Sequence, residues 1–312
     1  MTRTSLGRTQ LSVFPLCLGG NVFGWTADEG QSHAVLDAYV AAGGNFIDTA
    51  NSYLTEHGRS ETIIGRWLAE RADRDEIVLA TKVGGGRGAV RNLKADTIER
   101  EAHASLQRLQ TDRIDLYYAH FDDEQTPLEE SLRTFDELVE SGAVRHIGAS
   151  NYSPQRLAAA LGLQRELGFT EFTVLQPHYN LVERDFERTL LPVAESWHLA
   201  VLPYFALAKG FLTGKYRPEG EAVESPRAEA ARSYLDNGGR GALEALDEVA
   251  ATHHTTVAAV ALAWLGAQPR VVAPIASART TEQLAQILPA ATLQLTAAEV
   301  EWLSGASGLS AS

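Results

Sequence analysis

The stretch Asn45-Phe46-Ile47-Asp48-Thr49-Ala50-Asn51-Ser52-Tyr53 organises the predicted fold. Two glycines end a helical pattern before it, and Phe46 and Ile47 suit a short buried strand. Asp48 then places a carboxylate where that strand ends. Tyr53 follows after enough residues for a turn to bring its hydroxyl back over the same end. A carboxylate and a phenol at one strand end exceed what a fold requires, so we expect a functional site there.

Strand and helix patterns alternate along the chain on both sides of this stretch. Apolar runs of strand length cover residues 15–18, 46–49, 76–80, 114–118, 143–149, 173–175, 199–202 and 271–275. Helical patterns cover residues 26–43, 60–70, 97–109, 128–139, 154–167, 187–197, 242–253, 257–265 and 281–288, followed by a helical tail. About eight strands alternating with helices require parallel pairing and right-handed crossovers. In 312 residues they predict an α/β fold, a single (β/α)8 barrel domain over residues 1–312.

Two further features are expected around the barrel. A short hairpin formed by residues 4–7 and 11–14 should precede it, and a long polar loop over residues 209–240 should follow the seventh strand. A doubly wound open sheet is the competing fold. It is disfavoured because no Gly-x-Gly-x-x-Gly motif opens a helix after an early strand, and Gly84-Gly85-Gly86 lacks the spacing of a phosphate loop.

Composition limits the classes of partner. Hydrophobic residues make up 45% of the chain and charged residues 21%, as in an ordinary globular protein. The formal net charge of −13 argues against general affinity for nucleic acid or anionic membranes. The single cysteine, Cys17, fits a reducing compartment and a buried strand position. The apolar run at residues 11–18 is too short to span a membrane and has no signal-like cleavage pattern. We therefore expect a cytoplasmic protein without membrane or nucleic-acid partners; no sequence feature indicates an oligomer interface.

Polar residues follow the predicted strands in register. They are Asp48, Lys82, His120, Ser150, Asn151, Gln176 and Tyr204. Each alone has an ordinary interpretation as a turn, packing or solvated residue. Because a barrel carries its active site at the C-terminal ends of its strands, their joint occurrence favours a site at that rim.

Three of these rim residues, together with Tyr53, suggest a mechanism. A phenol has an unperturbed pKa of about 10, and a nearby ammonium lowers it, so Lys82 is expected to make Tyr53 a better acid. Asp48 should keep Lys82 charged and in place. His120 can donate a hydrogen bond to a carbonyl oxygen or relay a proton. Since the set holds no nucleophile, we expect one to come from elsewhere, such as a hydride from a bound cofactor.

These residues carry a family resemblance over nearly the whole chain. Asp48-Thr49-Ala50-x-x-Tyr53, Thr81-Lys82 and His120 resemble the catalytic tetrad of the aldo-keto reductases. Further blocks resemble the same family, namely Leu18-Gly19-Gly20, Gly148-Ala149-Ser150-Asn151, Leu175-Gln176-x-x-Tyr179-Asn180 and Gly210-Phe211-Leu212-Thr213-Gly214-Lys215-Tyr216. The long loop before Arg240 is similar to that of the bacterial, potassium-channel-β-like branch.

The resemblance implies a barrel that binds NADP(H) and reduces aldehydes or ketones, or oxidises the alcohols. It implies that Tyr53 is the general acid, tuned by Lys82 and Asp48, and that His120 orients the carbonyl. Ser150, Asn151 and Gln176 then hold the nicotinamide carboxamide, Tyr204 stacks on its ring, and residues 205–215 cover the pyrophosphate. The expected cofactor-binding residues are Gly20, Asn21, Asp48, Ser150, Asn151, Gln176, Tyr204, Phe205, Ala206, Leu207, Lys209, Gly210, Leu212, Lys215, Ser277, Arg279, Gln283 and Gln286.

Basic residues near the last two strands bear on the choice of cofactor. Lys209, Lys215 and Arg217 follow the seventh strand, and Arg279 follows the eighth, where barrels commonly hold phosphate. Arg279 would fork onto a ribose 2′-phosphate and favour NADPH over NADH; otherwise it is a solvated loop cation.

The family pattern is not matched at every cofactor position. Ala276-Ser277 stands where the family often has Pro-Gly, so Ser277 either binds a phosphate or completes a turn. Gln283 matches, but Gln286 and Ile287 replace the usual Glu-Asn pair near the adenine.

The substrate side is less clearly marked. Trp25 and Phe121 are candidates for an apolar wall beside Tyr53 and His120, with ordinary packing as the alternative. Residues 122–124 are expected to be a solvated acidic loop. A metal-dependent hydrolase is disfavoured because no His-x-His pair ends a strand. A nucleotide-binding regulatory subunit with slow turnover remains the alternative to a carbonyl reductase.

Overall fold

A sheet of eight parallel strands forms the centre of the computed structural model, which describes residues 3–53, 56–85, 91–217, 225–236 and 238–307. The strands are β3 (Cys17–Gly19), β4 (Phe46–Asp48), β5 (Val78–Val83), β6 (Ile114–Ala119), β7 (Val144–Ser150), β8 (Val174–Gln176), β9 (Ala200–Val201) and β10 (Ile275–Ala276). Their order in the sheet is β10-β3-β4-β5-β6-β7-β8-β9, and each neighbouring pair is parallel. This order confirms the predicted (β/α)8 barrel.

The two edges of the sheet meet between β9 and the chain leading into β10. The Val201 N–H donates to the Arg270 carbonyl (2.9 Å), and the Val272 N–H donates to the Val201 carbonyl (3.0 Å). The Ile275 N–H donates to the Pro203 carbonyl (2.9 Å). The strand predicted over 271–275 is therefore two pieces, a single bridge from Val271 to Val201 and the short β10.

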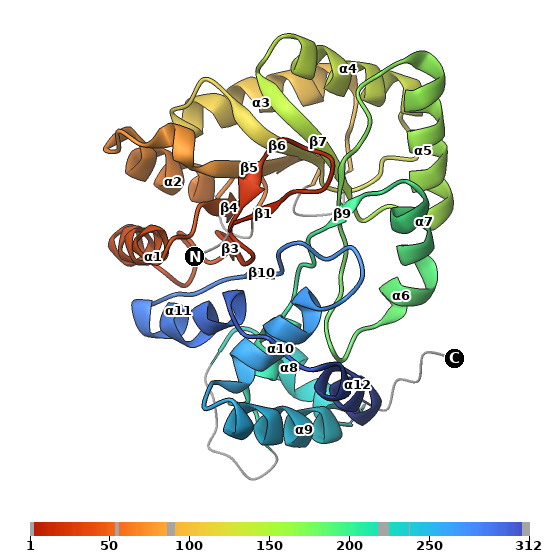
Figure 1. Cartoon of the computed structure of the whole chain (residues 1–312). Coiled ribbons are helices and arrows are strands. Elements are labelled where there is room, and N and C mark those ends of the chain that lie inside the picture. Colours follow the sequence, from red (N-terminus) through yellow and green to blue (C-terminus); the bar gives the residue numbers. More distant parts are fainter. Residues whose placement is uncertain (1–2, 54–55, 86–90, 218–224, 237, 308–312) are drawn as a thin grey trace.

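Helices surround the strands. In Figure 1, α1 to α5 run from the left over the top to the right of the strands, and α8 to α12 lie below them. Their bounds are α1 (Glu29–Ala41), α2 (Arg59–Ala69), α3 (Ala95–Leu109), α4 (Leu128–Glu140), α5 (Pro154–Leu167), α6 (Asp185–Thr189), α7 (Leu191–Ser196), α8 (Ala228–Arg232), α9 (Gly239–Thr252), α10 (Val257–Gly266), α11 (Thr281–Ile287) and α12 (Ala297–Ala306), with short 3-10 turns η1 (Arg74–Glu76), η2 (Ala208–Thr213), η3 (Ser233–Asp236) and η4 (Leu288–Ala291). The Asp28 capping box begins α1, and Ser153 with Pro154 begins α5.

Two further predicted elements differ from the structure. The helix expected over 187–197 is the separate pair α6 and α7, because Pro192 lacks an N–H and can only open a new helix. The loop expected over 209–240 contains η2, α8 and η3; part of that prediction, residues 218–224 and 237, lies outside the described residues. Buried contacts order this segment, since the rings of Phe211 and Tyr234 pack at 5.6 Å.

The N-terminal hairpin closes one end of the barrel. Strands β1 (Thr4–Ser5) and β2 (Ser12–Val13) pair antiparallel, as predicted. The buried side chains of Leu6, Leu11 and Val13 pack in one apolar cluster with Cys17 and Phe46 from the barrel interior. Because Cys17 is buried there, it is the strand thiol that the sequence predicted.

Strand alternation directs one set of side chains inward and up to the opposite rim. On β5, Val78 and Ala80 belong to the interior cluster, and the inward position that follows them is Lys82. On β4, Phe46 is in the same cluster, and its next inward neighbour is Asp48. On both strands the inward-facing residues are therefore apolar until the last inward position, which carries a charged group at the rim.

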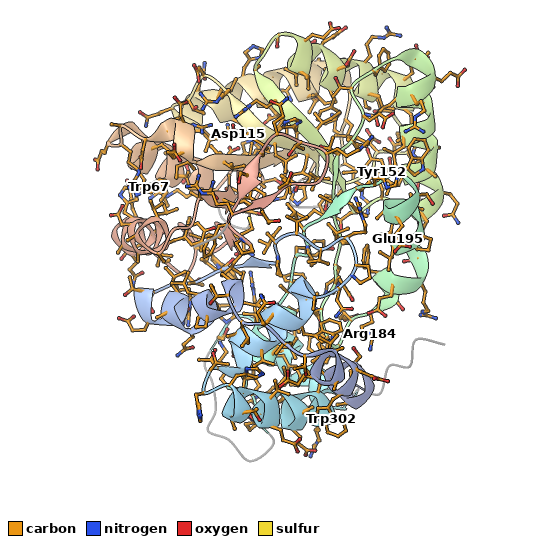
Figure 2. The ribbon with its side chains drawn as sticks, viewed as in Figure 1. Trp67, Asp115, Tyr152, Arg184, Glu195 and Trp302 are labelled. Atoms are coloured by element: carbon orange, nitrogen blue, oxygen red, sulfur yellow. The ribbon has the colours of Figure 1, made fainter. Side chains whose placement is uncertain are left out.

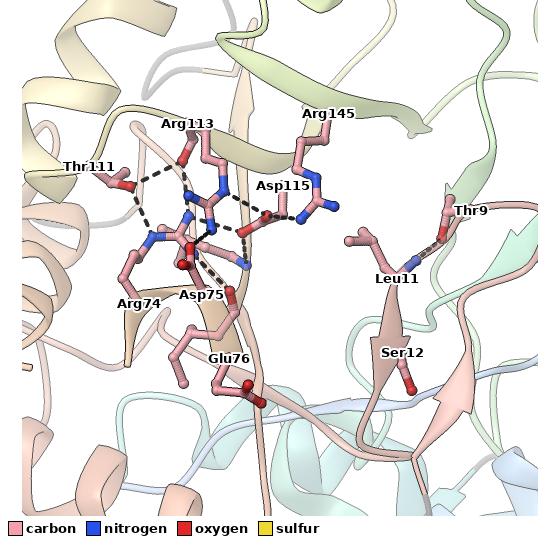
Figure 3. Close-up of polar contacts among 12 residues, drawn as sticks. Thr9, Leu11, Ser12, Arg74, Asp75, Glu76, Thr111, Arg113, Asp115 and Arg145 are labelled. Carbon is pink, nitrogen blue, oxygen red and sulfur yellow. Dashed lines mark hydrogen bonds and ion pairs between the residues drawn. The ribbon is translucent and has the colours of Figure 1, made fainter. Parts of the chain in front are cut away.

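A buried carboxylate, Asp115, braces the other side of the sheet. Its oxygens accept hydrogen bonds from the Leu79 N–H (3.0 Å), Arg74 (3.0 Å) and Arg145 (3.1 Å), and Arg113 lies 3.7 Å away. Figure 3 shows the three guanidinium groups converging on this one carboxylate. Asp115 therefore ties the segment before β5 to β6 and β7.

The outer surface offers few large apolar side chains. Trp302 on α12 is 53% exposed and lies at the periphery in Figure 2. Among the described helices, none combines the length and apolar character needed to cross a membrane.

Candidate active site

The Lys82 ammonium is the centre of the rim cluster. It donates to Asp48 Oδ2 (2.6 Å), to the Thr49 carbonyl (2.7 Å) and to the Tyr53 hydroxyl (2.9 Å). These contacts use all three of its donors, although only 1% of the side chain is exposed. The sequence predicted the Asp48 and Tyr53 contacts but gave no signal for the Thr49 carbonyl.

Asp48 ties the lysine to the other side of the barrel. Its Oδ2 also accepts the Tyr53 hydroxyl (3.0 Å), and its Oδ1 accepts the Gln176 amide (2.9 Å). Tyr53 thus accepts from Lys82 and donates to Asp48. Residues from β4, β5 and β8 are joined in one chain of hydrogen bonds.

The ionisation of this cluster differs from the prediction for Tyr53. Burial, and next the Asp48 carboxylate, raise the pKa of the Tyr53 hydroxyl well above its ordinary value, so it is not lowered as the sequence suggested. Burial lowers the pKa of Lys82, and Asp48 opposes that shift. The phenol is therefore firmly protonated, and the sequence missed this because desolvation depends on how the surroundings close over the ring.

His120 lies beside Tyr53 with its ring nearly perpendicular, at 83° and 6.3 Å between centroids. Its Nδ1 is 3.4 Å from the Ser52 hydroxyl. Burial, and next the Lys82 ammonium, lower the pKa of His120 from 6.5 to about 3. The imidazole is consequently neutral at physiological pH and carries one donor and one acceptor nitrogen.

A second network holds the next part of the rim. The Asn151 amide donates to the His120 carbonyl (2.8 Å) and to the Ser150 hydroxyl (3.0 Å), and Ser150 donates to the Gln176 carbonyl (2.8 Å). The Tyr204 hydroxyl donates to Asn151 Oδ1 (2.8 Å). The predicted carboxamide-binding residues and the predicted tetrad therefore lie on one connected rim.

Tyr204 has a neighbour that the sequence did not identify. The ring of His178 stacks on it at 5.4 Å and 15°, which covers one face of the tyrosine. Burial lowers the pKa of His178, so this ring is a neutral support. Only the strand register that pairs His178 with Tyr204 brings the two together.

The segment after Tyr204 has an unusual backbone. Phe205, Ala208 and Lys209 adopt positive φ angles of 50°, 47° and 58°, followed by Gly210 at 97°. Positive φ is uncommon outside glycine and concentrates at functional sites. Successive turns of this kind form concave anion-binding surfaces from backbone N–H groups. This segment includes the predicted Ala206, Leu207 and Leu212, which are largely buried, and ends near Lys215, which is exposed.

The predicted phosphate ligands divide into available and occupied groups. Lys209 and the half-buried Arg279 form no ion pair with a carboxylate within the described part of the chain. The Arg279 N–H is fixed by Gln283 Oε1 (3.0 Å). Arg217 is occupied instead, since its guanidinium makes two 2.7 Å bonds to Asp247.

Other predicted cofactor positions are packed against one another. Ser277 donates to Asn21 Oδ1 (2.7 Å), so within the chain it links two rim loops. A Cβ on Gly19 would lie 2.6 Å from the Ser277 hydroxyl, which explains the glycine before Gly20. Gln286 is exposed on α11, with its carbonyl accepting from Thr256.

The predicted substrate wall carries two arginines that the sequence did not identify. Phe121 lies 4.7 Å from the His120 ring, and the Arg91 guanidinium lies 5.4 Å above Phe121. Arg227 lies 5.1 Å above the Trp25 ring. Both arginines are distant in sequence from the aromatic residues that they contact, so no local sequence pattern predicts these contacts.

The acidic loop over residues 122–124 is solvated as predicted only at Glu124, which is exposed. Asp122 is buried and accepts two 3.0 Å bonds from Arg156. Asp123 is buried and accepts from Thr126 (2.6 Å) and from the Leu93 N–H (3.0 Å). Internal donors take up both carboxylates.

A parallel barrel whose rim joins a phenol, an ammonium, a carboxylate and a neutral imidazole defines a class of protein, an enzyme equipped for proton transfer at a polar double bond. Within the described residues, no cluster of three or more histidine, cysteine or acidic side chains is suited to hold a metal ion.

Comparison with known proteins narrows the class to a family. Residues 15–307 match the model of the aldo/keto reductase family. The chain is 37% identical to the uncharacterized oxidoreductase YrpG of Bacillus subtilis, over 95% of this chain and 92% of that protein. It is 34% identical to the putative aryl-alcohol dehydrogenase AAD14 of Saccharomyces cerevisiae, over 96% and 86%, and 34% identical to norsolorinic acid reductase A of Aspergillus parasiticus, over 94% and 78%.

The chain therefore belongs to the aldo/keto reductase family, as its sequence indicated. It is an oxidoreductase of a family that generally uses a nicotinamide cofactor and acts on small-molecule carbonyl compounds. Its assignment to the potassium-channel-β-like branch stays a prediction.

Proposed function

We propose that this protein is an NADPH-dependent reductase of aldehydes or ketones in which Tyr53 donates the proton. The observation that carries the proposal is the hydrogen-bond chain from Lys82 through the Tyr53 hydroxyl to Asp48, with neutral His120 beside it. Its natural partner would be a small carbonyl or alcohol, and its cytoplasmic location stays a prediction.

Tyr53 is protonated before reaction because its pKa is raised. Its proton now points to Asp48 and would turn to a carbonyl oxygen bound above it. Lys82, 2.9 Å from the hydroxyl, would then stabilise the phenolate that remains. His120 would donate a hydrogen bond from its neutral ring and so fix the carbonyl.

The proposed cofactor site fits a nicotinamide dinucleotide phosphate. When bound, NADPH supplies the hydride for the reduction. Ser150, Asn151 and Gln176 would hold its carboxamide, and the face of Tyr204 opposite His178 would support the ring. Lys209 and Arg279 would hold phosphate groups, as cations without carboxylate partners in the described chain. The remaining expected contacts are Gly20, Asn21, Asp48, Phe205, Ala206, Leu207, Gly210, Leu212, Lys215, Ser277, Gln283 and Gln286.

The substitution Tyr53→Phe tests the proton donor. It removes the hydroxyl but keeps the ring, so we expect NADPH to bind nearly as before while turnover of aromatic aldehydes falls by about a hundredfold or more, the scale of general acid catalysis. Aromatic aldehydes suit the assay because one relative is named an aryl-alcohol dehydrogenase. Turnover like that of the unmodified protein would refute the assignment.

The substitution Arg279→Ala tests the cofactor preference. We expect the KM for NADPH to rise much more than the KM for NADH, because only NADPH carries the 2′-phosphate. Arg217→Ala is the control, since Arg217 already pairs with Asp247. Equal effects of Arg279→Ala on the two cofactors would remove it from this role.

A regulatory subunit with slow turnover is the alternative. The assembled tetrad argues against it, because binding alone does not require the buried lysine. Steady-state NADPH oxidation with a panel of reactive aldehydes separates the two, since a regulatory subunit would bind NADPH without appreciable turnover.

A further inference from the structure

The substrate side of the rim carries two positively charged groups in a chain of net charge −13. Arg91 lies over Phe121, whose ring packs against the His120 ring. Arg227 lies 5.1 Å above the Trp25 ring and 5.7 Å above the Phe205 ring. Both aromatic residues of the predicted substrate wall therefore have an arginine above them.

Arg227 is half-buried between its two aromatic neighbours. Burial lowers its pKa below the ordinary value, and the charges that Tyr216 and Tyr53 would carry as phenolates oppose that shift. The guanidinium therefore lies within electrostatic range of the proposed proton donor. A partly desolvated cation without a counter-ion is costly, and a bound anion would remove that cost.

Neither arginine forms an ion pair within residues 3–53, 56–85, 91–217, 225–236 and 238–307. The nearest acids in the sequence to Phe121, Asp122 and Asp123, are buried and taken up by Arg156, Thr126 and a backbone N–H. A guanidinium that lies over a ring without an ion pair still has N–H donors to offer, and these match a carboxylate in pairs.

We propose that Arg91 and Arg227 form an anion-recognising rim, so that the enzyme prefers aromatic carbonyl substrates that carry a carboxylate away from the reacting group. The aromatic wall would hold the ring, the tetrad the carbonyl, and the two arginines the charged end. This inference rests on the proposed carbonyl reductase function, and its test separates the two.

The first experiment compares 4-carboxybenzaldehyde with 4-methylbenzaldehyde, which differ in charge at one position. For the unmodified protein we expect kcat/KM to be about tenfold or more higher for the carboxylate, the scale of a charge-assisted hydrogen bond. Arg91→Gln and Arg227→Gln should each reduce this ratio, and the double variant should abolish it, while turnover of the neutral aldehyde changes little. Arg133→Gln is the control, because Arg133 also lies over a ring, Phe169, but on α4.

Two kinetic outcomes would overturn the rim while leaving the reductase function intact. One is equal kcat/KM for the two aldehydes in the unmodified protein. The other is a raised KM for NADPH in Arg227→Gln with an unchanged substrate ratio, which would make Arg227 a cofactor ligand.

A binding experiment covers the case in which neither aldehyde is reduced. Tryptophan fluorescence would follow the binding of 4-methylbenzoate and 4-methylbenzamide, which cannot react. Tighter binding of the benzoate, lost in the double variant, would support the rim although the reductase function had failed. Equal binding of the two probes would overturn the rim.

Discussion

Replacing Lys82 with methionine tests whether the rim is held by charge. The substitution keeps most of the apolar stem and removes an ammonium that makes three hydrogen bonds of 2.6, 2.7 and 2.9 Å. Asp48, which is 2% exposed, would keep only the Gln176 amide and the Tyr53 hydroxyl as partners. A buried carboxylate would then lack its counter-ion.

The expected cost follows from that unpaired charge. Removing one partner of a buried ion pair typically costs about 3–5 kcal/mol of the free energy of unfolding, and we expect Lys82→Met to fall in this range at pH 7. The double variant Asp48→Asn with Lys82→Met should be more stable than the single variant by about 2 kcal/mol or more, because no charge remains buried alone.

Urea unfolding followed by circular dichroism measures these free energies without needing enzyme activity. Lys94→Met is the control, because Lys94 is exposed, and its effect should stay within about 0.5 kcal/mol. If Lys82→Met cost less than about 1 kcal/mol, or the double variant were the less stable of the two, the buried ion pair would not hold the rim together.

Three further measurements test other parts of the structure. His120 in the folded protein stays neutral down to its pKa of about 3, whereas the imidazole of the unfolded chain takes up a proton below about pH 6.5, so lowering the pH reduces the free energy of unfolding by up to about 1.4 kcal/mol per pH unit. The variant His120→Asn should remove this contribution in urea titrations between pH 4 and 6, and an unchanged pH slope would contradict the pKa shift. Asp115→Asn should lower the free energy of unfolding by about 2–3 kcal/mol, because it neutralises the carboxylate on which three arginines converge. A loss below about 0.5 kcal/mol in the same assay would show that this ion-pair cluster does not stabilise the sheet. Gly65→Ala should destabilise the protein by about 2 kcal/mol or more, because its Cβ would meet the Arg108 carbonyl. Gly162→Ala, in open space on α5, should instead stabilise it by about 0.5–1 kcal/mol. Changes in melting temperature of the same sign for the two variants would contradict the packing.

The sequence predicted the barrel and the rim because both depend on local patterns. Strand runs ending in a polar residue recur along the chain, and parallel strands bring their carboxyl ends to one rim. Asp48, Lys82 and Tyr53 could thus be placed together before any contact was known, and the hairpin could be predicted from its turn. Helix boundaries were predicted least well where proline intervenes, as at Pro192.

What the sequence missed depends on contacts between distant segments. Arg227 meets Trp25 only because the segment after the seventh strand folds back over the loop after the first. Asp122 is buried where Arg156, on α5, pairs with it. The direction of the Tyr53 pKa shift was predicted wrongly for a related reason, since the neighbour Lys82 could be predicted from the sequence but the degree of burial could not.

The seam between β9 and β10 should influence where the barrel opens locally. Each of these strands has two residues, whereas β6 and β7 pair along five positions. With so few hydrogen bonds to break, the seam should be the first part of the barrel to open, and its amides the first to exchange with solvent. Tyr204 follows one side of the seam, and Ser277 and Arg279 follow the other. A ligand that contacts both sides would hold the seam closed and slow amide hydrogen exchange there.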